Sequence, residues 1–171
     1  GEIALRIIRT CKEMGIKTVA VHSSADSNLK HVLLADETVC IGPAASNQSY
    51  LDMPKIISAA EVTDSVAIHP GYGFLAENDK FAQKIIDAGI IWIGPKPSTI
   101  ISMGDKDIAR DLALKSNLPI CPGLNNKELE KEDLEKKCNE IGFPILVKAS
   151  VGGGGIGMQI VNDYNELVKS V

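Results

Sequence analysis

The chain has 171 residues, of which 44% are hydrophobic and 23% are charged. These fractions exclude a disordered, collagen-like or disulfide-scaffold chain, and no apolar run approaches the roughly 20 residues of a membrane span. The 18 basic and 22 acidic residues give a net charge of −4, which argues against a broad nucleic-acid surface. We therefore expect no nucleic-acid and no membrane partner, and any anion site must be local.

Helical and strand patterns alternate through the first 96 residues. Helices are predicted over 2–14, 29–35, 54–62 and 79–88, and apolar strands over 17–21, 37–41, 65–68 and 90–93. Strands separated by such helices are typical of a parallel sheet covered on both faces. We therefore predict an open, Rossmann-like α/β domain over 1–96. Its helical pattern starts at residue 1, so the expected first strand is missing and we expect an N-terminal fragment.

The pattern changes after Pro95. Helices are predicted over 98–117 and 127–138, strands over 145–149 and 158–161, and a last helical pattern over 165–171. These elements predict linker helices and the first part of a second, α+β domain over 97–171, which we expect to be truncated.

The four cysteines form no Cys-x-x-Cys pair, and no histidine lies at ligand spacing from them. Zinc and redox centres therefore lack support. We expect reduced structural thiols, with Cys11 on an apolar helix face and Cys40 buried in an apolar strand.

Five glycines fall within residues 152–157 and formally satisfy Gly-x-Gly-x-x-Gly. The dinucleotide fingerprint also requires a helix directly after the loop and an acidic residue about 20 positions further on. Here residues 158–161 have strand character, and the chain ends before any such acid. The Walker A pattern is excluded too, because no Gly-Lys-Ser or Gly-Lys-Thr follows the glycines.

The remaining interpretation is a hairpin whose glycine tip lets backbone N–H groups approach a phosphate. Lys148 lies near the end of the entering strand and can place its ammonium beside the same phosphates. The alternative is a flexible hairpin with a solvated lysine. Four successive glycines cost ordering entropy that a purely structural turn rarely carries, so the pattern favours phosphate binding.

The segment Val-Lys-Ala-Ser-Val-Gly-Gly-Gly-Gly-Ile-Gly-Met at 147–158 resembles the glycine-rich flap of ATP-grasp enzymes. Four upstream segments resemble biotin carboxylases specifically, and they are His69 to Asn78, Ile93-Gly-Pro, Met103-Gly-Asp-Lys106 and Asp36 to Pro43. The resemblance covers essentially the whole chain. Residues 20–36 are most similar to the biotin carboxylase subunit of bacterial and plastid acetyl-CoA carboxylase, whereas propionyl-CoA, methylcrotonoyl-CoA and pyruvate carboxylases share the other motifs.

The resemblance implies a ligase that uses ATP with Mg²⁺ or Mn²⁺ to activate bicarbonate as carboxyphosphate. It then carboxylates biotin held on a biotin carboxyl carrier protein, as the first half-reaction of acetyl-CoA carboxylase in fatty acid synthesis. Carboxyltransferase subunits are the further partners that it implies. The implied location is the bacterial cytoplasm or the plastid stroma.

Site residues follow from the same resemblance. Lys106 and Lys148 are expected to contact ATP phosphates and the adenine side of the site, where fixed positive charge offsets phosphate charge. Gly154 and Gly155 are expected to supply flap backbone at the phosphates, and Met158 to pack near the adenine. Without the resemblance, Lys106 is interpreted as an exposed surface lysine.

Two further expectations concern the first domain. The resemblance places Tyr72 near biotin, although a tyrosine between two glycines can simply shape a turn. It also implies a homodimer contact at Arg9 and Glu13, which are four apart on the first helix and otherwise form a solvated ion pair. His69 is interpreted as a packing or hydrogen-bonding histidine rather than a catalytic base.

The sequence departs from the flap pattern at two positions. Val151 stands where a small residue is common, and Ile156 replaces an expected Arg or Lys. The family's magnesium-binding, bicarbonate-activating and biotin-facing catalytic residues would lie beyond residue 171, so we expect no catalytic residue and no biotin-dependent ATP hydrolysis in this chain alone. The alternatives are another ATP-grasp ligase, such as carbamoyl phosphate synthase or a purine-pathway carboxylase, and a non-catalytic nucleotide-binding or dimerisation fragment.

Overall fold

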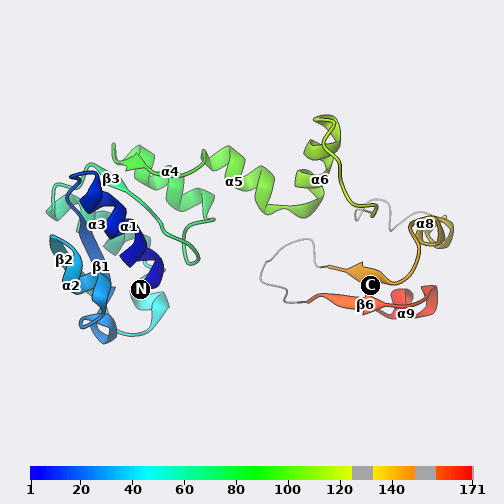
Figure 1. Cartoon of the computed structure of the whole chain (residues 1–171), viewed down its shortest axis with the longest axis horizontal. Helices are drawn as coiled ribbons and strands as arrows, with labels where there is room; N and C mark the ends of the chain where they lie inside the picture. The colour runs from blue at the N-terminus through cyan, green and yellow to red at the C-terminus, as the bar shows by residue number, and fades with distance from the viewer. Residues whose placement is uncertain (125–132, 149–156, 171) are drawn as a thin grey trace. The chain divides into compact units, whose positions relative to one another are not determined.

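The computed structural model describes residues 1–124, 133–148 and 157–170. The chain divides into two compact units, 1–100 and 101–171, and each is described by itself (Figure 1). Unit 1 alternates helices with parallel strands, and unit 2 combines helices with an antiparallel hairpin. The predicted fold class, an α/β unit followed by the beginning of an α+β unit, is confirmed.

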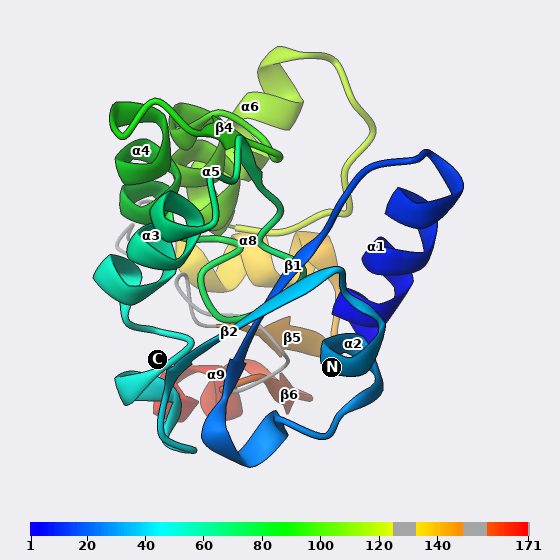
Figure 2. The same ribbon diagram turned by 90° about the vertical axis from the view of Figure 1, so that its left-hand side faces the viewer.

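Four short strands of unit 1 form two parallel pairs, β1 (Val19–Ser23) with β2 (Glu37–Gly42) and β3 (Ala67–Ile68) with β4 (Ile91–Trp92). The helices are α1 (Glu2–Glu13), α2 (Lys30–Leu34), α3 (Met53–Val62) and α4 (Asp79–Asp87), with 3-10 turns η1 (Ser24–Asp26) and η2 (Ser46–Gln48). Figure 2 shows α1 and α2 to one side of β1 and β2, and α3 to the other. Helices therefore cover both sides of this pair, as predicted.

The strand pairs differ from prediction in one respect. Among the described residues, β1–β2 and β3–β4 are separate two-stranded sheets rather than one sheet of four strands. The strand predicted over 17–21 is also displaced and begins at Val19. The reason lies in Thr18, whose backbone N–H and hydroxyl both donate to Asp36 Oδ2, at 2.7 and 2.8 Å. This side-chain contact takes the place of a ladder bond at the start of the strand.

The core of unit 1 lies where α4 packs on β4. Six buried residues form it, namely Leu75, Phe81, Ala82, Ile85, Trp92 and Ile100. The rings of Phe81 and Trp92 meet edge to face with centroids 5.7 Å apart. Asn78 begins α4, because its Oδ1 accepts the N–H of Phe81 at 2.8 Å. The cap and the core together fix the end of the loop that follows β3.

Unit 2 contains α6 (Lys106–Lys115), α8 (Leu134–Ile141), β5 (Ile145–Val147), β6 (Gln159–Val161) and α9 (Tyr164–Ser170), while α5 (Pro97–Gly104) crosses the division between the units. The single helix predicted over 98–117 is wrong. It is interrupted at Asp105, whose Oδ1 accepts the N–H groups of Asp107 and Ile108 and so begins α6. Of the charged helix predicted over 127–138, residues 134–138 lie in α8, which continues to Ile141, and positions 127–132 lie outside the described residues.

The core of unit 2 is small and joins α8 and α9 to one face of the hairpin. Its buried residues are Cys138, Val161 and Leu167. The thiol of Cys138 is thus structural, and its burial raises its pKa. Cys40, predicted to be buried, is exposed, because in β2 only its neighbour Ile41 is buried and successive strand side chains point to opposite faces. No helix among the described residues is long and apolar enough to cross a membrane.

Candidate functional site

The candidate site is built on the β5–β6 hairpin. Its antiparallel register pairs Ile145 with Val161, Leu146 with Ile160, and Val147 with Gln159. Side chains alternate between the two faces of such a pair. Because Ile145, Val147 and Val161 pack toward the core of unit 2, the directly opposed Leu146 and Ile160 lie on the other face.

Lys148 and Met158 stand one position beyond the last ladder pair, so the same alternation puts them on the face of Leu146 and Ile160. We call Leu146, Lys148, Met158 and Ile160 the outer hairpin face. All four are exposed, with 44% of Leu146 and 65% of Ile160 accessible to solvent. The structure therefore brings together Lys148 and Met158, two of the residues that the sequence predicts for the site.

Leu146 and Ile160 were not predicted from the sequence as site residues. The signal for them was present, since strict alternation over 145–148 and 158–161 places both on the face of Lys148. The resulting surface has three apolar side chains beside one ammonium group. Such a surface suits a ligand with a flat apolar ring and an anionic group nearby, because the ring removes apolar area from water while the lysine pairs with the charge.

Lys106 is the exposed first residue of α6. The Asp105 carboxylate already accepts the N–H groups of Asp107 and Ile108, at 2.9 and 3.0 Å. This helix N-terminus therefore offers fewer backbone donors to an anion than an uncapped one. The exposed side chain of Lys106 is the predicted phosphate contact at this terminus.

Other predicted flap positions lie outside the described residues, namely Gly154, Gly155, Val151 and Ile156. A metal site also receives no support from the part of the chain that is described. Within 1–124, 133–148 and 157–170, no group of three His, Cys, Asp or Glu side chains lies close enough together to hold a metal ion.

In unit 1, Tyr72 lies in the turn that follows β3 and is 75% exposed. Its neighbours Gly71 and Gly73 have φ of 67° and 73°, values that favour glycine. His69 holds the start of the turn, because its Nδ1 accepts the N–H of Gly71 at 3.0 Å. Of the two roles predicted for this histidine, packing and hydrogen bonding, the contact matches the second.

Arg9 and Glu13 are both exposed on α1. The ion pair considered between them is not formed in the described structure, whose ion pairs include Lys55–Asp52 and Lys137–Asp133. Their side chains are thus held by no salt bridge to each other.

Two family models match the chain in succession. Residues 1–100 match the biotin carboxylase N-terminal domain, and residues 105–171 match the ATP binding domain of the carbamoyl-phosphate synthase L chain. The biotin carboxylase of Allochromatium vinosum is 57% identical over 173 aligned residues, which cover 100% of this chain and 38% of that protein. The chain therefore spans well under half the length of this relative.

Solved structures that are similar to this chain include biotin carboxylases as well. A biotin carboxylase from Campylobacter jejuni, in a β-γ-ATP complex, is 42% identical with a TM-score of 0.90, over 99% of this chain and 38% of that one. The biotin carboxylase domain of the Hydrogenobacter thermophilus 2-oxoglutarate carboxylase is 43% identical with a TM-score of 0.87, over 99% and 37%. That second structure is a dimer in complex with MgADP, ADP and bicarbonate.

A parallel α/β unit followed by an ATP-binding domain of this kind is the arrangement of the ATP-grasp proteins. Within that class, the match over residues 1–100 decides between a carbamoyl phosphate synthase and a carboxylase. The chain belongs to the biotin carboxylase family.

Proposed function

We propose that this chain is the N-terminal part of a biotin carboxylase, which uses MgATP and bicarbonate to carboxylate biotin on a carrier protein. We propose that this reaction is the first half-reaction of acetyl-CoA carboxylase in fatty acid synthesis. Carboxyltransferase subunits are the further partners in this proposal. The observation that carries the proposal is the outer hairpin face, within a region that matches an ATP-binding domain. Bicarbonate and MgADP are bound by a relative that is 43% identical, which supports the same ligands here.

In this proposal the adenine of ATP packs on Leu146, Met158 and Ile160. Lys148 directs its ammonium at the phosphates, and Lys106 adds a second cation from α6. Fixed cations offset phosphate charge without having to reorganise when the ligand arrives. Gly154 and Gly155 are proposed as the flap backbone at the phosphates. The described residues give no ligand set for Mg²⁺, which when bound neutralises phosphate charge.

In this proposal, unit 1 contacts the other substrate, biotin. Tyr72 is proposed near biotin because ligand loops of open α/β domains follow the carboxyl ends of parallel strands, and Tyr72 follows β3. The exposed Arg9 and Glu13 are proposed as a homodimer contact, with support from the dimer of a relative. We further propose a domain boundary near 96 and 97, and a cytoplasmic or plastid location like that of the enzymes that the sequence resembles.

ATP binding by the chain tests the outer hairpin face. We expect ATP to protect the backbone amides of residues 145–148 and 157–161 from hydrogen exchange. Lys148→Gln should weaken binding at least about tenfold, because a charge-assisted contact is lost. Ile160→Glu should abolish it, because a carboxylate then stands where the adenine packs.

The matched control is Val168→Glu, which places the same charge on an exposed apolar position of α9, 59% accessible and away from the outer hairpin face. Equal loss of ATP binding in Val168→Glu and Ile160→Glu would contradict the assignment, as would an unprotected wild-type hairpin. Biotin-dependent ATP hydrolysis is expected from the longer protein and not from residues 1–171 alone. Turnover by the 171-residue chain with biotin, bicarbonate and MgATP would overturn this last point.

A further inference from the structure

The loop that carries Tyr72 is connected to a distant part of unit 1 through an aromatic stack. The ring of Phe74 lies on the ring of Tyr50, with centroids 5.1 Å apart and planes 15° from parallel. We propose that Tyr50 is a positioning residue that holds the turn of Tyr72 in place through Phe74. The proposal rests on the proposed function, because it is the role of Tyr72 at biotin that gives the positioning a purpose.

Tyr50 is fixed at its hydroxyl end. The hydroxyl donates to Asp26 Oδ2 at 2.5 Å and accepts the backbone N–H of Ser23 at 2.9 Å. The Ser23 hydroxyl donates to the same carboxylate oxygen at 2.8 Å, and Ser23 is buried at the end of β1. Tyr50 is therefore bound to the carboxyl end of β1, while Phe74 belongs to the loop after β3. The stack joins two loops that follow parallel strands, where open α/β domains place ligands.

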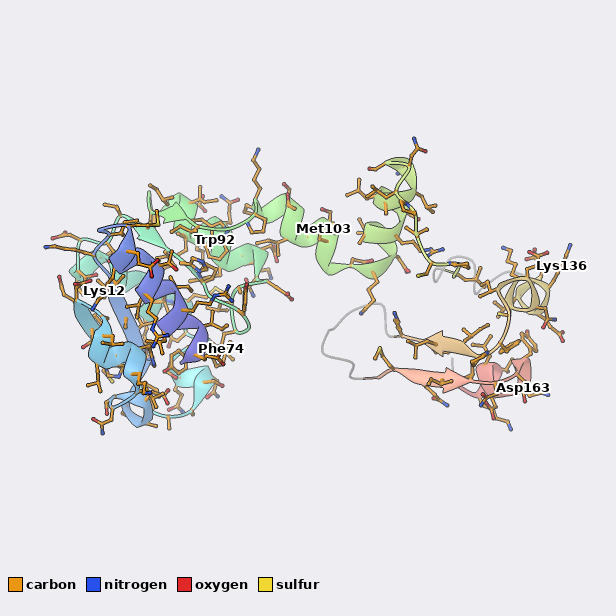
Figure 3. The ribbon with its side chains drawn as sticks, viewed as in Figure 1. Lys12, Phe74, Trp92, Met103, Lys136 and Asp163 are labelled. Carbon is orange, nitrogen blue, oxygen red and sulfur yellow. The ribbon has the colours of Figure 1, made fainter. Side chains whose placement is uncertain are left out.

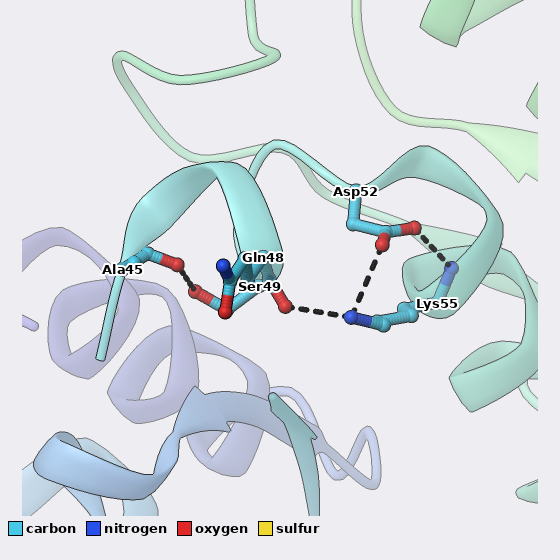
Figure 4. A network of polar contacts seen from close by, with 5 residues as sticks. All are labelled: Ala45, Gln48, Ser49, Asp52 and Lys55. Atoms are coloured by element: carbon cyan, nitrogen blue, oxygen red, sulfur yellow. Dashed lines mark hydrogen bonds and ion pairs between the residues drawn. The ribbon is translucent and has the colours of Figure 1, made fainter. Parts of the chain in front are cut away.

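The backbone before and after Tyr50 is fixed as well (Figure 4). Ser49 is fully buried, and its hydroxyl donates to a carbonyl within the same turn. Lys55 donates its ammonium to the carbonyl of Gln48 at 2.7 Å and pairs with Asp52 at 3.1 Å. Tyr50 is thus the rigid member of the stack.

Phe74 is the member that needs support. Its φ of 43° is in the left-handed region, which a residue with an aromatic side chain rarely adopts. Its side chain is 62% exposed and is labelled in Figure 3. The strain of such a residue and the gain from a stacked aromatic pair are of the same order. The stack on Tyr50 therefore offsets the strain that Phe74 carries.

Tyr72 has no comparable anchor of its own. In the described structure its side chain makes no hydrogen bond, ion pair or ring contact, so its position follows from the backbone. That backbone passes through Gly71 and Gly73, which have access to other conformations. The nearest fixed points are the turn at His69, the stack at Phe74 and the buried Leu75. Loss of the stack removes the side-chain fixed point two residues from Tyr72 and leaves the hydrogen bonds of the backbone groups of Gly71 and Gly73.

Amide exchange measured residue by residue tests the connection in the 171-residue chain. Tyr50→Leu removes the ring and should raise exchange about tenfold at Gly71 and Ala76, whose N–H groups are bonded within the loop. Tyr50→Phe keeps the ring and should leave these amides within about twofold, while exchange of the Ser23 amide rises because it loses its acceptor. Phe74→Leu, at an exposed position, should reproduce the loop effect with Ser23 unchanged, and it replaces Tyr50→Leu if that variant does not fold.

The effect of Tyr50 on function is measured as KM values of the longer protein. Tyr50→Leu should raise KM for free biotin about fivefold to tenfold and leave KM for ATP unchanged, and Tyr50→Phe should restore KM for biotin. Unchanged loop amides in both Tyr50→Leu and Phe74→Leu overturn the connection itself. A second outcome is that the loop amides respond to Tyr50→Leu but its KM for biotin does not change. If Tyr72→Ala nevertheless raises KM for biotin, the positioning role proposed for Tyr50 is overturned. If Tyr72→Ala leaves KM unchanged as well, the role of Tyr72 in the proposed function has failed instead.

Discussion

At the carboxylate of Asp26, two hydroxyl groups converge on one oxygen, those of Tyr50 and Ser23. Both favour the charged form, so the pKa of Asp26 lies below its usual value, with the Tyr50 bond as the largest cause and burial acting in the opposite direction. Burial of the ring, followed by the same contact with Asp26, raises the pKa of Tyr50. The pair is thus set to hold an ionised carboxylate beside a neutral phenol.

This pKa shift predicts a pH dependence of folding. A carboxyl group with a lowered pKa in the folded state stabilises the fold above its unfolded pKa, about 3.9, and loses that contribution as the pH falls through the folded pKa. We expect the urea midpoint of the wild type to fall more steeply below about pH 5 than that of Asp26→Asn. Tyr50→Phe, which removes the largest cause, should lie between them. Parallel midpoint curves for wild type and Asp26→Asn would show that the two hydroxyl bonds do not couple to folding.

Some individual residues of the candidate site could be predicted from the sequence, and others could not. Lys148 was predicted because it lies next to the glycines and Met158 because of the family resemblance, and the alternation that includes Leu146 and Ile160 was equally visible. The role of Tyr50 was not visible. Its partners include Asp26 and Phe74, each 24 residues away, and no local pattern in the sequence signals a contact that only the folded chain brings about.

At the scale of elements, the end of β2 depends on a close approach of two backbones. Gly42 has φ of 146°, and a Cβ atom placed on it would lie 2.2 Å from the carbonyl oxygen of Gln48 in η2. That carbonyl is held by Lys55, so it has little freedom to move away. The strand can turn into η2 at this distance only with glycine at the junction.

Gly42→Ala should therefore lower the free energy of unfolding by more than about 1 kcal/mol, because the substitution adds a clash to an unfavourable φ. The matched control is Gly104→Ala in α5, where nothing lies within 4 Å of the added Cβ and φ is not positive. That control should be neutral or stabilising by up to about 1 kcal/mol, as alanine favours helix. Urea unfolding measures both, and a neutral Gly42→Ala would mean that η2 shifts freely.

Elements were predicted well where one signal dominates and poorly where two compete. Helical periodicity located α1, α3 and α4, and short apolar runs located the paired strands. Over 98–117 the periodicity continues through Asp105, but the capping preference of aspartate breaks the helix there. Strand pairing depends on contacts between residues distant in sequence. The local sequence pattern therefore could not predict the two separate parallel pairs.

On the scale of the whole molecule, each unit has its own buried cluster. Ile85 belongs to the cluster of unit 1 and is fully buried, and Leu167 belongs to that of unit 2. No residue of the described chain is shared by the two clusters. The sequence pattern changes a few residues before the division between the units, because the alternation of strand and helix stops after Pro95.

Ile85→Ala should destabilise unit 1 by roughly 2–5 kcal/mol, since it removes buried methyl groups and leaves a cavity. Amides of β1, β2 and α4 should then exchange faster, whereas those of α8, β5 and β6 should keep their protection. Val168→Ala, at an exposed position of α9, serves as the control and should leave both units unchanged. Loss of protection throughout the chain in Ile85→Ala would show a single cooperative unit.

Separate cores also bear on how such a chain changes over evolutionary time. A substitution that enlarges or shrinks one cluster calls for compensation only among residues of that cluster. A crossover between related genes near residue 100 therefore leaves the described residues of each cluster together. Exchange of one half of this chain for that of a relative would keep the described residues of the other half's cluster together.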